Sequence, residues 1–152
     1  MPVARMACIA MALVATAILV IVLPLGSANS QADAITARKH NFHVLSEQMK
    51  AIVQGLGDGL PLSAMRDRVA RAEQALERLP HMFPPGSDRG KTRALPVIWA
   101  EPERFKATYD AARDRMDELV AAATQDDRTR FGGAVGRMAA ACGNCHAVFR
   151  AK

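Results

Sequence analysis

The 152-residue chain is poor in aromatic residues and in cysteine: it has one Trp, one Tyr, five Phe and three Cys. Lys and Arg outnumber Asp and Glu by 20 to 15, but the two signs are interspersed and form no basic block. So few aromatic rings and no basic patch argue against nucleic-acid binding. No Ser/His/Asp or paired-carboxylate arrangement stands out, so we expect no enzyme. Runs of β-branched residues are scarce, which disfavours a sheet.

One long apolar run without a charge occupies residues 6–25. Arg5 precedes it and a small, polar stretch (residues 26–30) follows, which is typical of a secretory signal peptide. We expect residues 1–30 to be a signal peptide cleaved after Ser30, or after Ala32 as second choice, and residues 31–152 to be the mature domain. The alternative is an uncleaved membrane anchor facing the periplasm, because about 20 apolar residues span a bilayer.

Two cysteines remain outside the leader, and both lie in the sequence Cys142-Gly143-Asn144-Cys145-His146. C-x-x-C-H is the haem attachment motif of c-type cytochromes. The two thiols form thioether bonds with the haem vinyl groups, and the histidine binds the iron. A dithiol redox pair would be expected in a βαβ pattern, and a zinc site would need further ligands nearby. Neither is visible in the sequence. We therefore predict one covalent haem c per chain, with His146 as the proximal iron ligand.

Apolar residues recur at alternating spacings of three and four in four segments, which indicates helices packed at shallow angles. The segments cover residues 42–56, 62–79, 105–123 and 131–149. Glycine and proline separate the first two, Asp126 and Asp127 favour the start of the last helix, and residues 80–102 form one long connection. The pattern predicts an all-α, antiparallel four-helix bundle, with the haem held against its interior by the C-terminal helix.

A second axial ligand for the iron must come from upstream or there is none, because residues 147–152 contain no Met or His. Met49 lies on the apolar stripe of the first segment, where a Met is more often a core residue. His40 and His43 lie on the same helix and are more simply exposed side chains. These three residues are the candidates for a sixth ligand.

The chain resembles the class II cytochromes c, which include cytochrome c′, over nearly all of residues 31–152. The resemblance is carried by four features: C-x-x-C-H followed by Phe149-Arg150; Met-Phe-Pro-Pro-Gly-Ser at residues 82–87; Thr-Arg-Ala-Leu-Pro-x-Ile-Trp at residues 92–99; and Arg38-Lys39 at the expected start of the first helix. It implies a four-helix bundle, usually a homodimer, that carries haem c in a bacterial periplasm.

The resemblance also implies roles for single residues. In this family the residue four positions after the first-helix Arg38 lies over the distal face of the haem, and here that residue is Phe42, which cannot bind iron. A five-coordinate centre with Phe42 as its lid is therefore implied. Arg150 would shape the proximal pocket, Arg38 and Arg93 would pair with haem propionates, and Trp99 would pack near the haem edge or cap the bundle.

Two functions remain open at this point. A five-coordinate haem would bind small gases, chiefly NO and CO. A six-coordinate, low-spin haem, with Met49 or a first-helix His as sixth ligand, would carry electrons between periplasmic redox proteins. The presence or absence of a strong sixth ligand discriminates between them.

Overall fold

The computed structural model describes residues 26–152. The predicted signal peptide lies for the most part outside these residues, and residues 26–30 belong to the first helix of the structure. Among residues 26–152, no helix is both long enough and apolar enough to cross a membrane.

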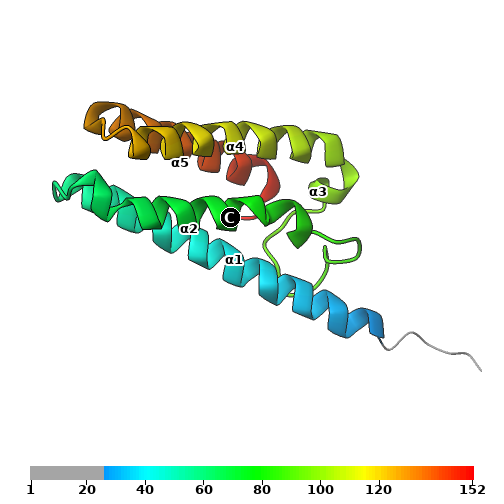
Figure 1. The fold of residues 1–152 in the computed structure, drawn as a ribbon. Helices are drawn as coiled ribbons and strands as arrows, with labels where there is room; N and C mark the ends of the chain where they lie inside the picture. The colour runs from blue at the N-terminus through cyan, green and yellow to red at the C-terminus, as the bar shows by residue number, and fades with distance from the viewer. Residues whose placement is uncertain (1–25) are drawn as a thin grey trace, which may run out of the picture.

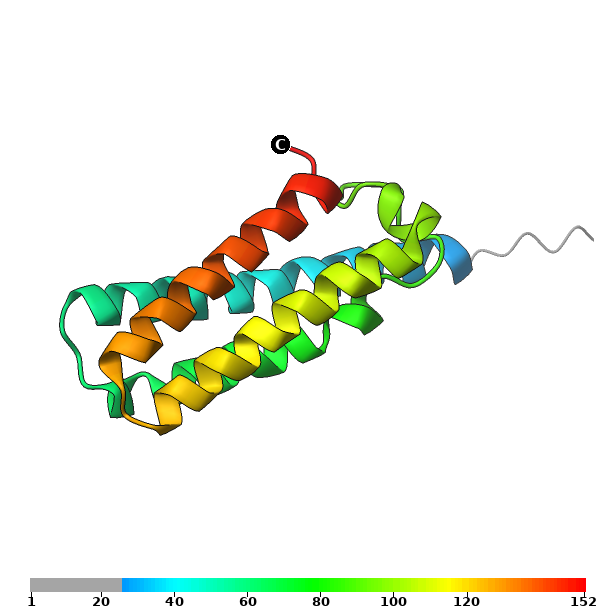
Figure 2. The ribbon, with the colours of Figure 1, turned by 90° about the horizontal axis from the view of Figure 1, so that it is seen from above.

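Four long helices make up the domain, in antiparallel order, and confirm the all-α bundle (Figure 1). They are α1 (Gly26–Gly57), α2 (Arg66–Glu77), α4 (Pro102–Thr124) and α5 (Arg128–Phe149). Helices α1 and α2 form one layer, and α4 and α5 form the other; Figure 2 shows the two layers crossing at an angle. Both termini of the described chain and the connection between α2 and α4 lie at the same end of the bundle.

The helix boundaries differ from the sequence prediction in two places. Helix α1 begins at Gly26, well before the start expected at Arg38. The segment 62–79 is not one helix, because α2 is flanked by two short 3₁₀ turns, η1 (Leu62–Ala64) and η2 (Leu79–Met82). Pro61 precedes the first turn and Pro80 lies in the second; a proline has no N–H to continue an α-helical ladder.

The connection from residue 80 to residue 102, called the long connection below, contains a further short helix, α3 (Val97–Ala100). Helix α4 follows with Pro102 in its first turn, where a missing N–H costs nothing. Asp127 caps α5 as predicted: its carboxylate accepts a hydrogen bond of 2.9 Å from the backbone N–H of Arg130. Asp126 lies in the preceding turn with a positive φ of 57°.

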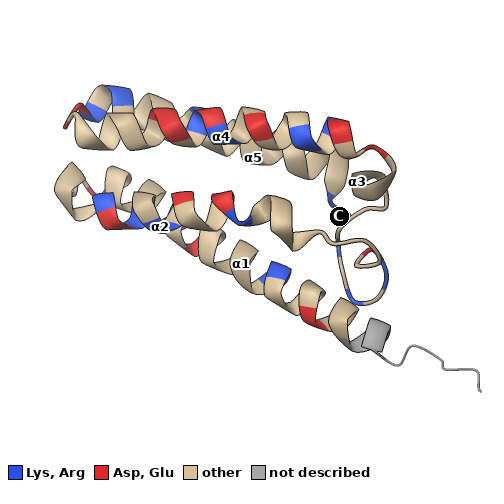
Figure 3. Ribbon diagram, turned by 45° about the vertical axis from the view of Figure 1, so that its right-hand side comes forward, with Lys and Arg blue, Asp and Glu red and all other residues tan. Residues whose placement is uncertain are grey.

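The core follows the apolar stripes read from the sequence. None of their residues is exposed, and the largest fully buried side chains come from all four long helices. These large core residues are Phe131, Ile52, Met65, Met116, Leu119, Met138 and Val69. Charged residues of both signs are spread along the helices (Figure 3), and the ion pair between Lys106 and Asp110 on α4 lies at the surface.

Some residues of the stripes are only half-buried, namely Phe42, Met49, Leu56, Phe105, Tyr109, Cys142 and Cys145. All of them except Leu56 line one cavity. The bundle core is therefore incompletely filled at this cavity.

Candidate functional site

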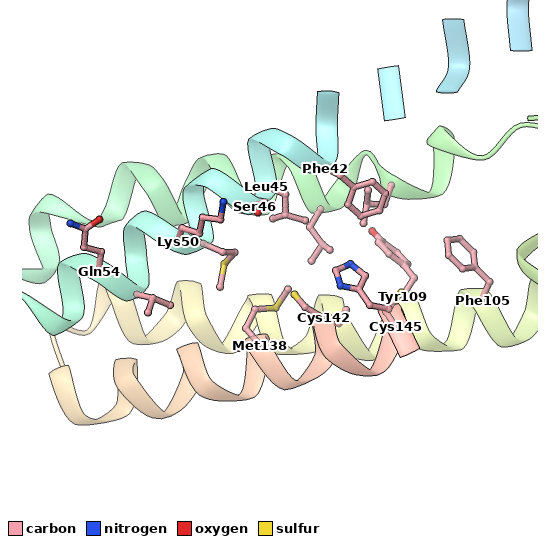
Figure 4. Close-up of a pocket in the computed structure, with 17 residues that line it drawn as sticks. Phe42, Leu45, Ser46, Lys50, Gln54, Phe105, Tyr109, Met138, Cys142 and Cys145 are labelled. Carbon is pink, nitrogen blue, oxygen red and sulfur yellow. The ribbon is translucent and has the colours of Figure 1, made fainter. Parts of the chain in front are cut away.

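A cavity of about 500 Å³ opens between α1 and α5, which contact each other far less than either contacts its own layer partner. Its walls are almost entirely apolar. Figure 4 shows side chains from α1, α4 and α5 converging on it. The lining comprises Phe42, Leu45, Ser46, Met49, Lys50, Val53, Gln54, Leu76, Leu79, Phe105, Tyr109, Ala112, Met138, Ala139, Cys142, Cys145 and His146.

The attachment motif lies on this cavity, as the helical spacing predicted. Cys142, Cys145 and His146 all line it from α5, within little more than one helical turn. Both thiols are free and half-buried. Burial raises the pKa of the Cys142 thiol, and burial together with the neighbouring Cys142 raises the pKa of the Cys145 thiol. The two sulfurs are thus presented to the cavity as neutral thiols.

His146 is flanked by positive charge. Arg150 lies one turn after His146, and its Nη1 is 3.4 Å from Nδ1 of the imidazole. Partial burial, followed by the charges of Arg150 and Arg93, lowers the pKa of His146. The imidazole is therefore held in its neutral form, which is the form that binds a metal.

The side of the cavity opposite the motif is formed by α1. Phe42, Leu45 and Met49, which lie on successive turns of its apolar stripe, all line the cavity. Figure 4 shows Phe42 and Leu45 on α1 directed toward the helix that carries Cys142 and Cys145. Phenylalanine and leucine offer no atom that binds iron, so Met49 is the one potential ligand among these three.

A second cavity of about 350 Å³ adjoins the first and shares Phe42, Ser46, Phe105, Cys145 and His146 with it. Basic side chains contribute to its lining: Arg38, Lys39, Arg93 and Arg150, with His43. Among residues 26–152, no Asp or Glu lines either cavity. This basic end of the cleft suits carboxylate groups that need compensating charge.

Arg38 has a role that sequence reasoning did not find. Its side chain is only 3% exposed, and its guanidinium donates hydrogen bonds to Met82 O, Ser87 Oγ, Ser87 O and Thr92 Oγ1 at 2.8–3.2 Å. It therefore ties α1 to the long connection. Its predicted pairing with a propionate stays a prediction.

Arg93 and Trp99 make hydrogen bonds that hold the long connection in place. Arg93 donates to the carbonyl of Ala151 through Nε (3.0 Å) and Nη2 (2.8 Å), which joins the long connection to the C-terminal residues. Trp99 lines neither cavity. Its Nε1 donates to the carbonyls of Phe83 and Pro84, both at 3.1 Å, so it fixes the long connection.

The remaining candidates have simple positions. His43 lines the second cavity, whereas His40 is exposed and lines neither. Sequence reasoning missed Ser46 and Lys50, which line the first cavity one and two turns after Phe42. The helical period of 3.6 residues, counted from Phe42, was the signal that could have found them.

The residues present fit a haem. Two thiols and a neutral imidazole face an apolar cleft from one helix, and arginine side chains lie at its basic end. An apolar cleft of this kind suits a flat, largely apolar macrocycle, and the basic end suits its carboxylates.

Comparisons with known proteins agree with this geometry. The family profile described as cytochrome c′ matches residues 33–150. The cytochrome c′ of Pararhodospirillum photometricum is 34% identical over 115 residues, which cover 74% of this chain and 92% of that protein. The cytochrome c′ of Rubrivivax gelatinosus is 32% identical, covering 79% and 95%.

Solved structures share the fold. The crystal structure of cytochrome c′ from Rubrivivax gelatinosus superimposes with a TM-score of 0.75 at 27% identity, covering 80% of this chain and 97% of that one. A nitric oxide complex of a cytochrome c′ variant from Alcaligenes xylosoxidans has the same fold, with a TM-score of 0.75 at 24% identity and the same coverage. The chain thus belongs to the cytochrome c′ family, whose members bind covalent haem c.

Proposed function

We propose that this protein holds a five-coordinate haem c, attached through Cys142 and Cys145 and bound by His146, and that it binds the small gases NO and CO. The observation that carries the proposal is Phe42. It lines both cavities from the helix opposite the motif, and it offers no ligand atom. The haem, when bound, supplies an iron with one open coordination position.

The chain's own residues would decide what reaches that position. Phe42, Leu45 and Met49 carry no N–H or O–H donor, so these three side chains would select a bound neutral ligand by size and not by hydrogen bonding. On the other side, burial and then the positive charges of Arg150 and Arg93 lower the pKa of His146, which favours the neutral imidazole. Arg93, with Arg38, would compensate the propionates at the basic end of the cleft.

Optical and EPR spectra of the ferric and ferrous protein, with and without CO, test the coordination state. We expect high-spin spectra without ligand and a large change on adding CO. The Phe42→Met variant should shift the ferric protein toward a six-coordinate, low-spin spectrum, because the thioether sulfur of Met would replace the Phe42 ring over the open coordination position of the iron. A low-spin spectrum of the unsubstituted protein, or no response of the spectrum to Phe42→Met, would contradict the proposal.

Electron transfer with a six-coordinate haem is the second candidate. Met49 lines the first cavity together with His146, and His43 lines the second. If either residue binds the iron, Met49→Leu or His43→Gln converts a low-spin spectrum to a high-spin one. If neither variant changes the spectrum, the candidate ligands read from the sequence do not bind.

We further propose a homodimer located in the periplasm, with redox proteins of that compartment as its partners and no catalysed reaction of its own. The family resemblance supports these points. Cell fractionation, light scattering of the haem-loaded protein and an assay for peroxidase turnover test them separately.

A further inference from the structure

Phe42 is held by an aromatic neighbour from the long connection. Its ring meets the edge of Phe83 with the centroids 6.3 Å apart and the planes at 71°. Among the described residues, Phe83 makes the one aromatic ring contact recorded for Phe42. Both rings line the second cavity, whereas Phe42 alone of the two also lines the first.

Phe83 itself is fixed on several sides. Its ring lies 4.9 Å from that of Phe105 and 5.9 Å from that of Trp99, both edge to face. Trp99 Nε1 also donates a hydrogen bond of 3.1 Å to the Phe83 carbonyl, so both the ring and the backbone of Phe83 are held. Edge-to-face pairs of this kind contribute about 1 kcal/mol each beyond their buried area.

The buried Arg38 links these two aromatic residues. Its guanidinium carbon lies 4.8 Å from the centroid of the Phe83 ring, and its hydrogen bonds to Ser87 and Thr92 hold the long connection. Arg38 is also one helical turn before Phe42 on α1. The same turn of α1 therefore carries Phe42 and anchors the segment that carries Phe83.

We propose that Phe83 is a positioning residue for Phe42, and that through Phe42 it sets the size of ligand the haem admits. The inference rests on the proposed function, in which Phe42 covers the open side of the iron. A diatomic needs little room. A longer ligand requires the Phe42 ring to move aside, and Phe83, which packs against that ring beside the second cavity, restricts the movement.

The test compares two ferrous ligands of different length on the haem-loaded protein, CO and n-butyl isocyanide. The measured quantity is the ratio of their affinities, because a general loss of stability or of haem reactivity moves both affinities together. For Phe83→Leu we expect the ratio to shift toward the isocyanide by about tenfold, the scale of a steric change in an apolar pocket.

Phe149→Leu is the matched control, because it is the same substitution at another residue that lines the second cavity but not the first. Among the described residues, Phe149 has a ring contact with Phe105 and none with Phe42 or Phe83. If the volume of the cavity alone decided selectivity, this variant would shift the ratio as far as Phe83→Leu. We expect it to stay within about twofold of the unsubstituted protein.

The double variant Phe42→Leu/Phe83→Leu shows whether Phe83 acts through Phe42. Phe42→Leu alone should raise the affinity for the isocyanide relative to that for CO. Adding Phe83→Leu should then change this ratio by less than about twofold, because the effects of coupled residues are not additive. Additive effects of the two substitutions would show that Phe83 acts directly, and would overturn the inference.

The outcomes separate the inference from the function on which it rests. If Phe42→Leu leaves the ratio unchanged, Phe42 does not cover the iron and the proposed function fails. If Phe42→Leu raises the ratio and Phe83→Leu does not, only the positioning role fails. Should Phe83→Leu not fold, Phe83→Met keeps the apolar bulk without the ring edge, and the same two results apply to it.

Discussion

Replacing Arg38 by Met should destabilise the folded protein more than any loss of surface charge would. The guanidinium makes four hydrogen bonds to the long connection, and the two to Ser87 are buried. Met has a similar length and remains compatible with a helix, so the change removes the polar contacts and leaves the backbone of α1 undisturbed.

The size of the effect follows from these contacts. A hydrogen bond from a charged donor contributes about 1.5–3 kcal/mol, so the two buried bonds alone represent about 3–6 kcal/mol. Burial also disfavours the charged guanidinium, as the lowered pKa of Arg38 indicates, and removing it returns part of that cost. We expect a net loss of about 3 kcal/mol in the free energy of unfolding, or about 10 °C in Tm.

Urea denaturation of the haem-loaded protein, followed by far-UV circular dichroism, measures this loss. Lys39→Met is the control, because it removes the same charge and introduces the same side chain at the exposed neighbouring position. Ser87→Ala weakens the contact between Arg38 and the long connection and leaves any contact between Arg38 and a haem propionate in place. It should lower the free energy of unfolding by about 1 kcal/mol. If Arg38→Met and Lys39→Met differ by less than about 1 kcal/mol, the buried contacts do not stabilise the fold.

Two further predictions concern α2 and α5. Burial, then repulsion from Glu77 and Asp117, raises the pKa of Glu73; the folded state therefore binds the proton more tightly, and stability falls as pH rises from the ordinary Glu pKa through the raised one. Glu73→Gln should raise Tm at pH values above this range and have little effect below it; an equal Tm difference at both ends would contradict the linkage. Asp127→Ala should cost about 1 kcal/mol in urea denaturation because the cap of α5 is lost, while Asp127→Ser should recover most of it; equal stability of the two variants would show that the cap does not contribute.

Local patterns in the sequence predicted much of the fold. Apolar spacing located the four long helices, and none of the stripe residues proved exposed. The ends of the elements were less predictable. Helix α1 already includes Gly26, upstream of the start expected at Arg38, and segment 62–79 ends in 3₁₀ turns on both sides of α2. Helix ends depend on capping contacts and on packing as well as on apolar period.

The candidate site likewise combines features that are local in the sequence with contacts between residues far apart in it. C-x-x-C-H places two thiols and an imidazole on one face of a helix wherever that helix lies, so the shared position of Cys142, Cys145 and His146 on the cleft could be predicted from sequence spacing alone. The contact of Arg150 with His146 is also local, four residues along α5. The partners of Arg38 are not: Ser87 lies 49 positions away, and no periodicity predicts which loop residue will accept its hydrogen bonds.

The sequence by itself determined the helices, the faces that pack inward and the covalent chemistry, because each depends on residues within one or two helical turns. Only the tertiary structure decided which residues of the apolar stripes stay half-buried, and hence where the cleft lies between α1 and α5. It also brought Phe83 against Phe42 from across the long connection. Contacts of that kind depend on how separately formed helices and a loop pack together, and no local pattern of residues encodes their distance.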